Sequence, residues 1–122
     1  MTHALSAELF ALDRNIRYVA VNQEGRLIEM AQNPRLPSHN PVETDRMEEL
    51  IVNPVAIELT RRRGDLDLQG LRFLLIRYGI QFQLVLPWRA GHISVGLEPS
   101  ADAVVVAERI LTVLASREAA AA

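Results

Sequence analysis

The most regular pattern of apolar and polar positions lies between residues 71 and 98, in the run LRFLLIRYGIQFQLVLPWRAGHISVGLE. Positions 80, 82, 84 and 86 are apolar with glutamine at 81 and 83, and positions 93, 95 and 97 are again apolar. A period of two is typical of β-strands with one buried face. The run therefore predicts strands over 71–77, 80–86 and 92–98, although LRFLLIRY also fits a helical turn or two. Tyr78-Gly79 and residues 87–91 predict tight turns between them.

A second pair of strands is predicted earlier in the chain. Residues 16–22 are rich in β-branched and aromatic side chains, and residues 26–31 return with apolar positions at 27, 28 and 30. Gln23, Glu24 and Gly25 separate them, and Gly25 supplies the positive φ that a tight turn needs. We expect a β-hairpin here.

Three helices complete the predicted fold. The first covers 2–14, with Thr2 or Ser6 as its cap, and the last runs from a Ser100 cap to about residue 116. The central helix begins at Asn40-Pro41 and ends at the arginines 61–63 with Gly64 at C′. Pro54 predicts a kink in this helix or a break into two.

The resulting order is α-β-β-α-β-β-β-α. It predicts an α/β protein of the α+β kind, with a five-stranded, mainly antiparallel sheet sandwiched by helices. The length of 122 residues fits a single domain over 1–118, followed by an alanine-rich tail at 119–122 that we expect to fray.

Composition excludes several kinds of chemistry. The chain has no cysteine, and all 13 basic residues are arginine, so thiolate sites and lysine Schiff bases are excluded. A net charge of -2 gives no electrostatic footprint for nucleic acid or an anionic membrane. We see no signal peptide and no apolar run near the ~20 residues of a membrane helix, so a cytoplasmic protein is expected.

Catalytic and metal-binding motifs do not stand out. His3, His39 and His92 lie far apart without metal-ligand spacing, and the sequence contains neither GxSxG nor a phosphate-binding glycine loop. Glu48-Glu49 and the Asp65/Asp67 pair are interpreted as solvated helix and linker faces. We therefore expect neither an enzyme nor a bound cofactor or metal.

Two segments carry a resemblance to a known family. VAVNQEGRLIEMA is a hairpin, and IRYGIQFQLVLPWRAGHISVGLEPSAD is a second sheet segment leading into the last helix. Over residues 5–114 the element order resembles the roadblock/dynein-light-chain family of the profilin-like and longin-like group. The resemblance implies a dimer that pairs through its central helix and an edge strand, and that regulates or scaffolds small Ras-like GTPases or motor complexes. Pro54 departs from the family, whose central helix is usually continuous.

Carried onto this chain, the resemblance implies a dimer interface on the central helix and the third strand. Its residues are Met47, Leu50, Ile51 and Val55, with Leu71, Phe73 and Leu75. An apolar edge strand also favours cover by a partner independently of the family, since unpaired strand edges promote aggregation.

Two further places are candidates for a partner surface. Trp88 and Arg89 lie at a predicted hairpin tip, where an exposed Trp-Arg pair has the composition of an interface hot spot. The alternative is a tryptophan folded back over the sheet. Arg61 and Arg62 either dock an acidic partner or form a solvated helix end that the helix dipole favours.

Three functions remain open from the sequence. The first is a homodimeric, non-enzymatic interaction module for a small GTPase or similar partner. The second is an acidic, dimeric secretion-type chaperone. The third is a small-ligand sensory domain of profilin-like shape.

Overall fold

All five strands form one antiparallel sheet with the order β2-β1-β5-β4-β3. The strands are β1 Ile16–Gln23, β2 Arg26–Gln32, β3 Leu74–Arg77, β4 Phe82–Trp88 and β5 Gly91–Leu97. The structure is a computed structural model that describes residues 4–37 and 42–121. The predicted α+β fold with five strands between helices is confirmed.

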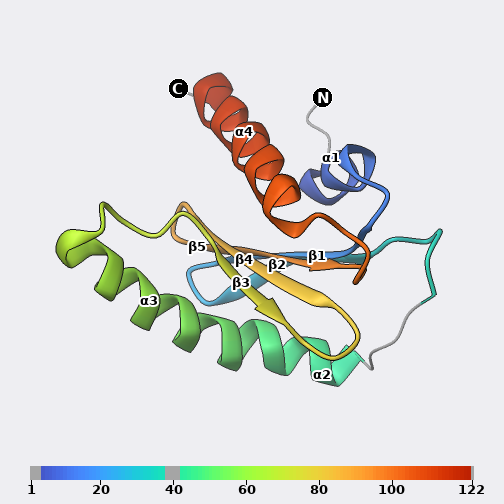
Figure 1. The fold of residues 1–122 in the computed structure, drawn as a ribbon, viewed down its shortest axis with the longest axis horizontal. Coiled ribbons are helices and arrows are strands. Elements are labelled where there is room, and N and C mark those ends of the chain that lie inside the picture. Colours follow the sequence, from blue (N-terminus) through green and yellow to red (C-terminus); the bar gives the residue numbers. More distant parts are fainter. Residues whose placement is uncertain (1–3, 38–41, 122) are drawn as a thin grey trace.

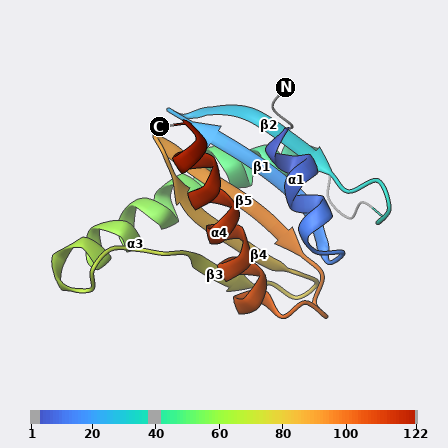
Figure 2. The ribbon, with the colours of Figure 1, turned by 90° about the horizontal axis from the view of Figure 1, so that it is seen from above.

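Helices cover both faces of the sheet (Figure 1). One face carries α1 Leu5–Leu12 and α4 Ala103–Ala121. The other carries a long helix built from α2 Val42–Met47, the π-helical turn η1 Glu48–Val52 and α3 Asn53–Asp67. Figure 2 shows that the end of α3 projects beyond the sheet before the chain returns to β3.

The apolar core lies between the sheet and the α1/α4 layer. Leu84, Leu86 and Trp88 point to this face at every second position of β4, and Ile93, Val95 and Leu97 do so from β5. Leu9 of α1 and Ile110 of α4 close the core from above and are fully buried. The strand periodicity seen in the sequence is thus the periodicity of this one face.

Pro87 accounts for two differences from the predicted strands. It was expected to start a turn, but it lies inside β4 opposite His92, and the turn to β5 is Arg89-Ala90. Pairing with β3 ends at Leu74 opposite Val85. Continued in register, Arg72 would face Pro87, which has no N–H to donate. The third strand is therefore 74–77 rather than 71–77, and β4 extends past the end of its neighbour.

The expected break at Pro54 does not occur. The N–H of Asn53 donates to the carbonyl of Glu48, five residues back, so the turn before the proline is a π-turn. The wider π-turn accommodates Pro54, which has no N–H to donate, and α3 therefore continues to Asp67. The predicted cap residues Asn40 and Pro41 lie outside the described residues.

The observed boundaries of the central helix and of the last helix also differ from the predicted ones. Gly64 is inside α3, and the left-handed pair Gln69 (φ 63°) and Gly70 (φ 89°) follows the helix instead. A Cβ on Gly64 would lie 3.0 Å from the backbone of Gly70, so close packing requires the glycine. Asp102, not Ser100, caps α4 by accepting from the N–H of Val105 at 3.4 Å. The alanine-rich tail continues this helix to Ala121.

Candidate protein-interaction surface

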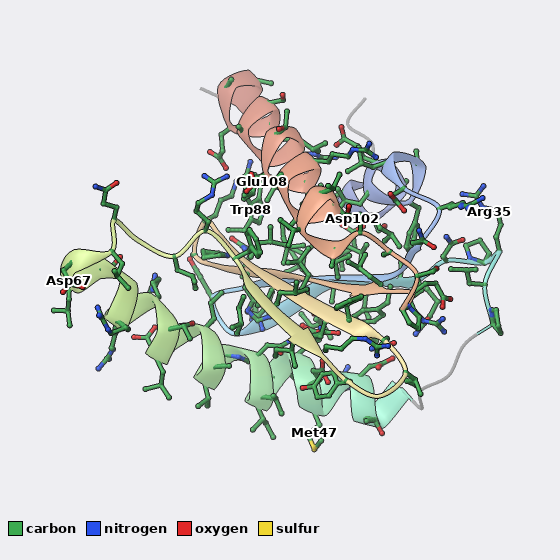
Figure 3. All side chains as sticks on the ribbon, viewed as in Figure 1. Arg35, Met47, Asp67, Trp88, Asp102 and Glu108 are labelled. Carbon is green, nitrogen blue, oxygen red and sulfur yellow. The ribbon has the colours of Figure 1, made fainter. Side chains whose placement is uncertain are left out.

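The long helix presents its apolar side to solvent. Met47, Ile51, Val55, Leu59 and Leu66 follow one another at intervals of four or seven residues and form what we call the outer stripe. Their exposed fractions are 51%, 60%, 58%, 64% and 80% in that order. Figure 3 shows Met47 pointing away from the sheet. Leu50 and Val52 flank the stripe and are also exposed.

The side of the same helix that faces the sheet is polar. Asp45, Glu49 and Asn53 are spaced by four residues and are all buried. A helix that covers a sheet usually has the opposite distribution, with its apolar stripe inward. This exposed apolar surface makes the outer stripe a candidate site for another molecule.

Glu49 is the centre of the contacts between helix and sheet. Its side chain is 1% exposed, and its Oε2 accepts a hydrogen bond from the Tyr18 hydroxyl at 3.2 Å. Its Oε1 accepts from the Asn53 amide at 3.2 Å and lies 3.2 Å from His92 Nε2. Tyr18 belongs to β1 and His92 to β5, so one carboxylate joins the helix to two strands.

The sheet supplies further polar partners on this face. Asn53 also donates to Ser94 Oγ at 3.2 Å, and Gln83 donates to the same oxygen. Asn22 donates to the backbone carbonyl of Glu49 at 3.3 Å. The π-turn leaves this carbonyl accessible because the Asn53 N–H bonds Glu48 instead. We call this set the buried polar layer: Tyr18, Asn22, Glu49, Asn53, Gln83, His92 and Ser94.

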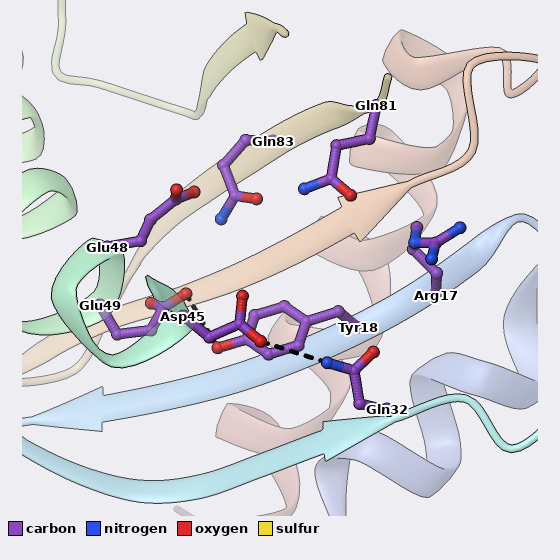
Figure 4. A pocket seen from close by; sticks show the side chains of 8 residues that line it. All are labelled: Arg17, Tyr18, Gln32, Asp45, Glu48, Glu49, Gln81 and Gln83. Atoms are coloured by element: carbon purple, nitrogen blue, oxygen red, sulfur yellow. Dashed lines mark hydrogen bonds between the residues drawn. The ribbon is translucent and has the colours of Figure 1, made fainter. Parts of the chain in front are cut away.

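A cavity of about 20 Å³ adjoins this layer and is lined by carboxylates, amides, Tyr18 and Arg17 (Figure 4). Burial raises the pKa of Tyr18 well above its usual range, and the carboxylates of Glu49 and Asp45 raise it further. The phenol therefore keeps its proton and remains a donor. Arg17 points elsewhere, donating to Glu98 and to the carbonyl of Pro37 at 2.5 Å each.

Glu48 lies between the buried polar layer and the surface. Burial, then the neighbouring charges of Glu49 and Asp45, raise its pKa to about 7. Its Oε1 is buried without a hydrogen-bond partner among the described residues. The ionised carboxylate is thus poorly compensated by the described residues around it.

Glu48 also lines a surface groove between the long helix and the loop from β3 to β4. The groove has a volume of about 310 Å³. We call it the helix–loop groove; its lining residues are Thr44, Asp45, Met47, Glu48, Val52, Tyr78, Ile80 and Gln81. Since Met47 belongs to both, the groove continues the outer stripe.

The residues predicted to form an interface on the third strand differ in how far they are exposed. β3 does lie at an edge of the sheet. However, Phe73 and Leu75 pack against the apolar core, and Leu75 is paired with the buried Leu84. Leu71 is half-buried in the connection before the strand. Phe73 and Leu75 are therefore partly buried against the core, and the apolar edge is shorter than the sequence suggested.

Trp88 as an exposed contact residue is wrong. It is 8% exposed and lies between the sheet and α4 (Figure 3). Arg89 remains at the surface, with its guanidinium carbon 4.4 Å from the centre of the Trp88 ring. It also pairs with Glu118 of α4 at 2.6 Å. These contacts fasten the hairpin tip to α4.

Arg61 and Arg62 are exposed at the far end of the long helix, as expected. Both bind the carboxylate of Glu58, at 2.9 Å and 2.8 Å. The two arginines face different ways. Arg61 lines a groove of about 270 Å³ beside the hairpin tips, whereas Arg62 continues the outer stripe.

The interpretation of Glu48-Glu49 as a solvated pair is wrong, because Glu49 is fully enclosed and Glu48 half so. The contact of His92 with Glu49 was not predicted from the sequence. The polar helix face did leave one signal in the sequence, since Asp45, Glu49 and Asn53 share the spacing of a helix face. That spacing alone could not show that this face is the inner one.

Comparisons add no identity to these observations. No protein-family model matches the chain, and a search of curated proteins gave no match. Within residues 4–37 and 42–121, no group of three or more acidic or histidine side chains could hold a metal ion. None of the described helices has the length and apolarity to cross a membrane.

Proposed function

We propose that this chain is a non-enzymatic interaction module that forms a homodimer through the outer stripe and then scaffolds or regulates another protein. The observation that supports this proposal most directly is the distribution of side chains on the long helix, which is polar toward its own sheet and apolar toward solvent. The resemblance to the roadblock family suggests a small Ras-like GTPase as the further partner.

The size of the surface favours a partner that covers more than the helix alone. From Met47 to Leu66 the stripe is roughly 30 Å long, and a helix is about 10 Å wide, which gives on the order of 300 Å². A stable interface buries about 800 Å² per partner. The adjoining helix–loop groove, with exposed Tyr78 and Ile80, and the open edge of β3 extend the stripe toward that area.

A second copy of the chain suits this surface. In a two-fold symmetric pair the same patch lies on both sides, so an apolar stripe meets an identical stripe. Side chains four residues apart form ridges that pack into the grooves of another such helix. Val55 lies near the middle of the stripe, and we place the two-fold axis there.

Replacing Val55 with aspartate tests the dimer. Val55→Asp puts two carboxylates opposite each other at the axis and removes apolar burial from both copies, which should raise the dimer Kd by about 100-fold or more. Sedimentation velocity over a concentration series measures this. Ile28→Asp is the matched control, because Ile28 is 62% exposed and lies on β2, at the edge of the sheet opposite β3.

The proposal fails if the wild type sediments as a monomer at all concentrations. It also fails if Val55→Asp and Ile28→Asp leave equal amounts of dimer. The further partner is tested separately, by interferometry with purified small Ras-like GTPases in their GDP and GTP forms. Absence of binding there would leave the dimer intact and remove only the GTPase.

A further inference from the structure

We propose that Arg62 of one protomer enters the helix–loop groove of a second copy and pairs with Glu48, so that two symmetric ion pairs fix the dimer register. This inference rests on the proposed homodimer and adds the polar contact that would align it. It concerns a groove and an arginine at opposite ends of the same helix.

The chemistry of the groove fits a guanidinium. Its walls are apolar at Met47, Val52 and Ile80, and its carboxylates belong to Asp45 and Glu48. None of the described residues that line the groove is an arginine or a histidine, and the chain contains no lysine. An arginine places its aliphatic stem along apolar walls and offers a fork of N–H donors to a carboxylate. The Glu48 side chain reaches the groove, and its Oε1 has no hydrogen-bond partner among the described residues, so a cation in the groove would compensate this carboxylate.

Arg62 is placed to leave its own protomer. Its side chain is 76% exposed, more than that of Arg61 at 53%. Seven residues after Val55, it lies within about 20° of the same helix face. Its pair with Glu58 is exposed and spaced i,i+4, a contact worth only about 0.3–0.5 kcal/mol. Exchanging Glu58 for a partly buried carboxylate therefore costs little.

An antiparallel arrangement brings the two groups together. With the axis at Val55, Arg62 is seven residues after it and Glu48 seven before it, so the two positions lie at about the same level, and Arg62 would reach Glu48 through the groove that Glu48 lines. Seven residues correspond to about 10 Å along a helix. For axes about 9 Å apart that cross near 50°, the axes at that level are roughly 13 Å apart. An arginine and a glutamate side chain together span such a gap.

The pairing would also make dimerisation depend on pH. The groups that face Glu48 are Asp45 and Glu49 of the long helix, Tyr18 of β1 and Tyr78 of the loop, whereas Arg17 of β1 lines the same cavity but donates to Glu98 and Pro37. In the separate protomer the pKa of Glu48 is about 7, whereas an arginine beside it would lower that pKa. Pairing then releases a proton, and the dimer tightens as pH rises from 6 to 8.

Charge reversal tests the pair by sedimentation velocity at pH 8. Arg62→Glu should raise the dimer Kd at least tenfold, and the swapped variant Glu48→Arg/Arg62→Glu should recover to within about threefold of wild type. Arg61→Glu is the matched control, since it carries the same charge change beside the same Glu58 but lines the other groove. It should stay within about threefold of wild type.

A second readout covers the case in which arginine at position 48 disturbs folding. The wild-type Kd should fall severalfold between pH 6 and pH 8, and Arg62→Gln should lose that dependence. Equal effects of Arg62→Glu and Arg61→Glu, or an unchanged pH dependence in Arg62→Gln, would overturn the pairing. If Val55→Asp still abolishes the dimer in that case, the homodimer stands and only the ion pair is wrong.

Discussion

The two faces of the sheet are built from different materials. The face toward α1 and α4 is closed by leucine, isoleucine, valine and one tryptophan, all within an apolar cluster. The face toward the long helix is closed by a carboxylate, amides, a histidine, a serine and a phenol, together with the buried apolar Ala20 and Val85. Apolar burial is non-directional, whereas each buried polar group needs a particular partner.

The two faces of the sheet have different roles: one stabilises the fold, and the other orients the long helix. The α1/α4 face supplies most of the hydrophobic free energy that holds the chain folded. The buried polar layer contributes less net free energy, but it defines one rotation and one height for the long helix. Glu49, bound from β1 and β5 at once, fixes which side of the helix faces outward. A helix held this way can expose an apolar stripe without turning it inward.

Truncating the apolar face should have the largest effect. Leu84 is fully buried in the cluster, so Leu84→Ala leaves a cavity and should lower the free energy of unfolding by about 3–4 kcal/mol. Urea unfolding of the Val55→Asp protein, where the dimer no longer contributes, measures it. On the same background Ile51→Ala should cost less than about 0.5 kcal/mol, because Ile51 is exposed. Equal losses at the two sites would contradict the contrast between core and stripe.

Truncating Glu49, the centre of the buried polar layer, should lower the free energy of unfolding by less than Leu84→Ala and should affect mainly the long helix. Glu49→Ala strands the Tyr18 hydroxyl and one Asn53 donor, and should lower the free energy of unfolding by about 2–3 kcal/mol. Glu49→Gln keeps the shape and one acceptor and should cost about 1 kcal/mol. Hydrogen exchange should quicken across 44–60 in Glu49→Ala but not in β4 and β5. Uniformly faster exchange would show that the layer supports the whole fold rather than the helix.

Local pattern predicted the sheet well because strand period and turn chemistry act over a few residues. The hairpin turn at Glu24 (φ 54°) and Gly25 (φ 77°) is where the sequence placed it. The burial of Trp88 was also available from the pattern, since 84, 86 and 88 share one face of a strand. Pro87 obscured it because a proline normally ends a central strand, and only the register shows that β3 has already stopped.

The buried polar layer could not be predicted in the same way. Its members come from positions 18, 22, 49, 53, 83, 92 and 94, and no local rule joins them. The sequence placed Met47, Leu50, Ile51 and Val55 on one apolar helix face, but such a face usually packs on its own sheet. Which side faces inward is decided by partners on other strands, and the π-turn before Pro54 depends on them too.

A smaller effect than that of Glu49→Ala is predicted for Glu48, at the boundary between the two environments of the long helix. Its pKa is raised from an ordinary 4.5 to about 7, so between these values the folded protomer keeps a proton that the unfolded chain releases. The associated stability is complete below pH 4.5 and is lost as pH rises through 7. On the Val55→Asp background we expect a loss of about 1–2 kcal/mol, reduced because solvent reaches part of the side chain. Urea unfolding at pH 4.5 and pH 8 should show this loss in the parent and little of it in Glu48→Gln. Glu24→Gln, at an exposed turn, is the control and should keep the parental pH profile. A parental profile in Glu48→Gln would mean that this carboxyl is better solvated than its buried Oε1 indicates.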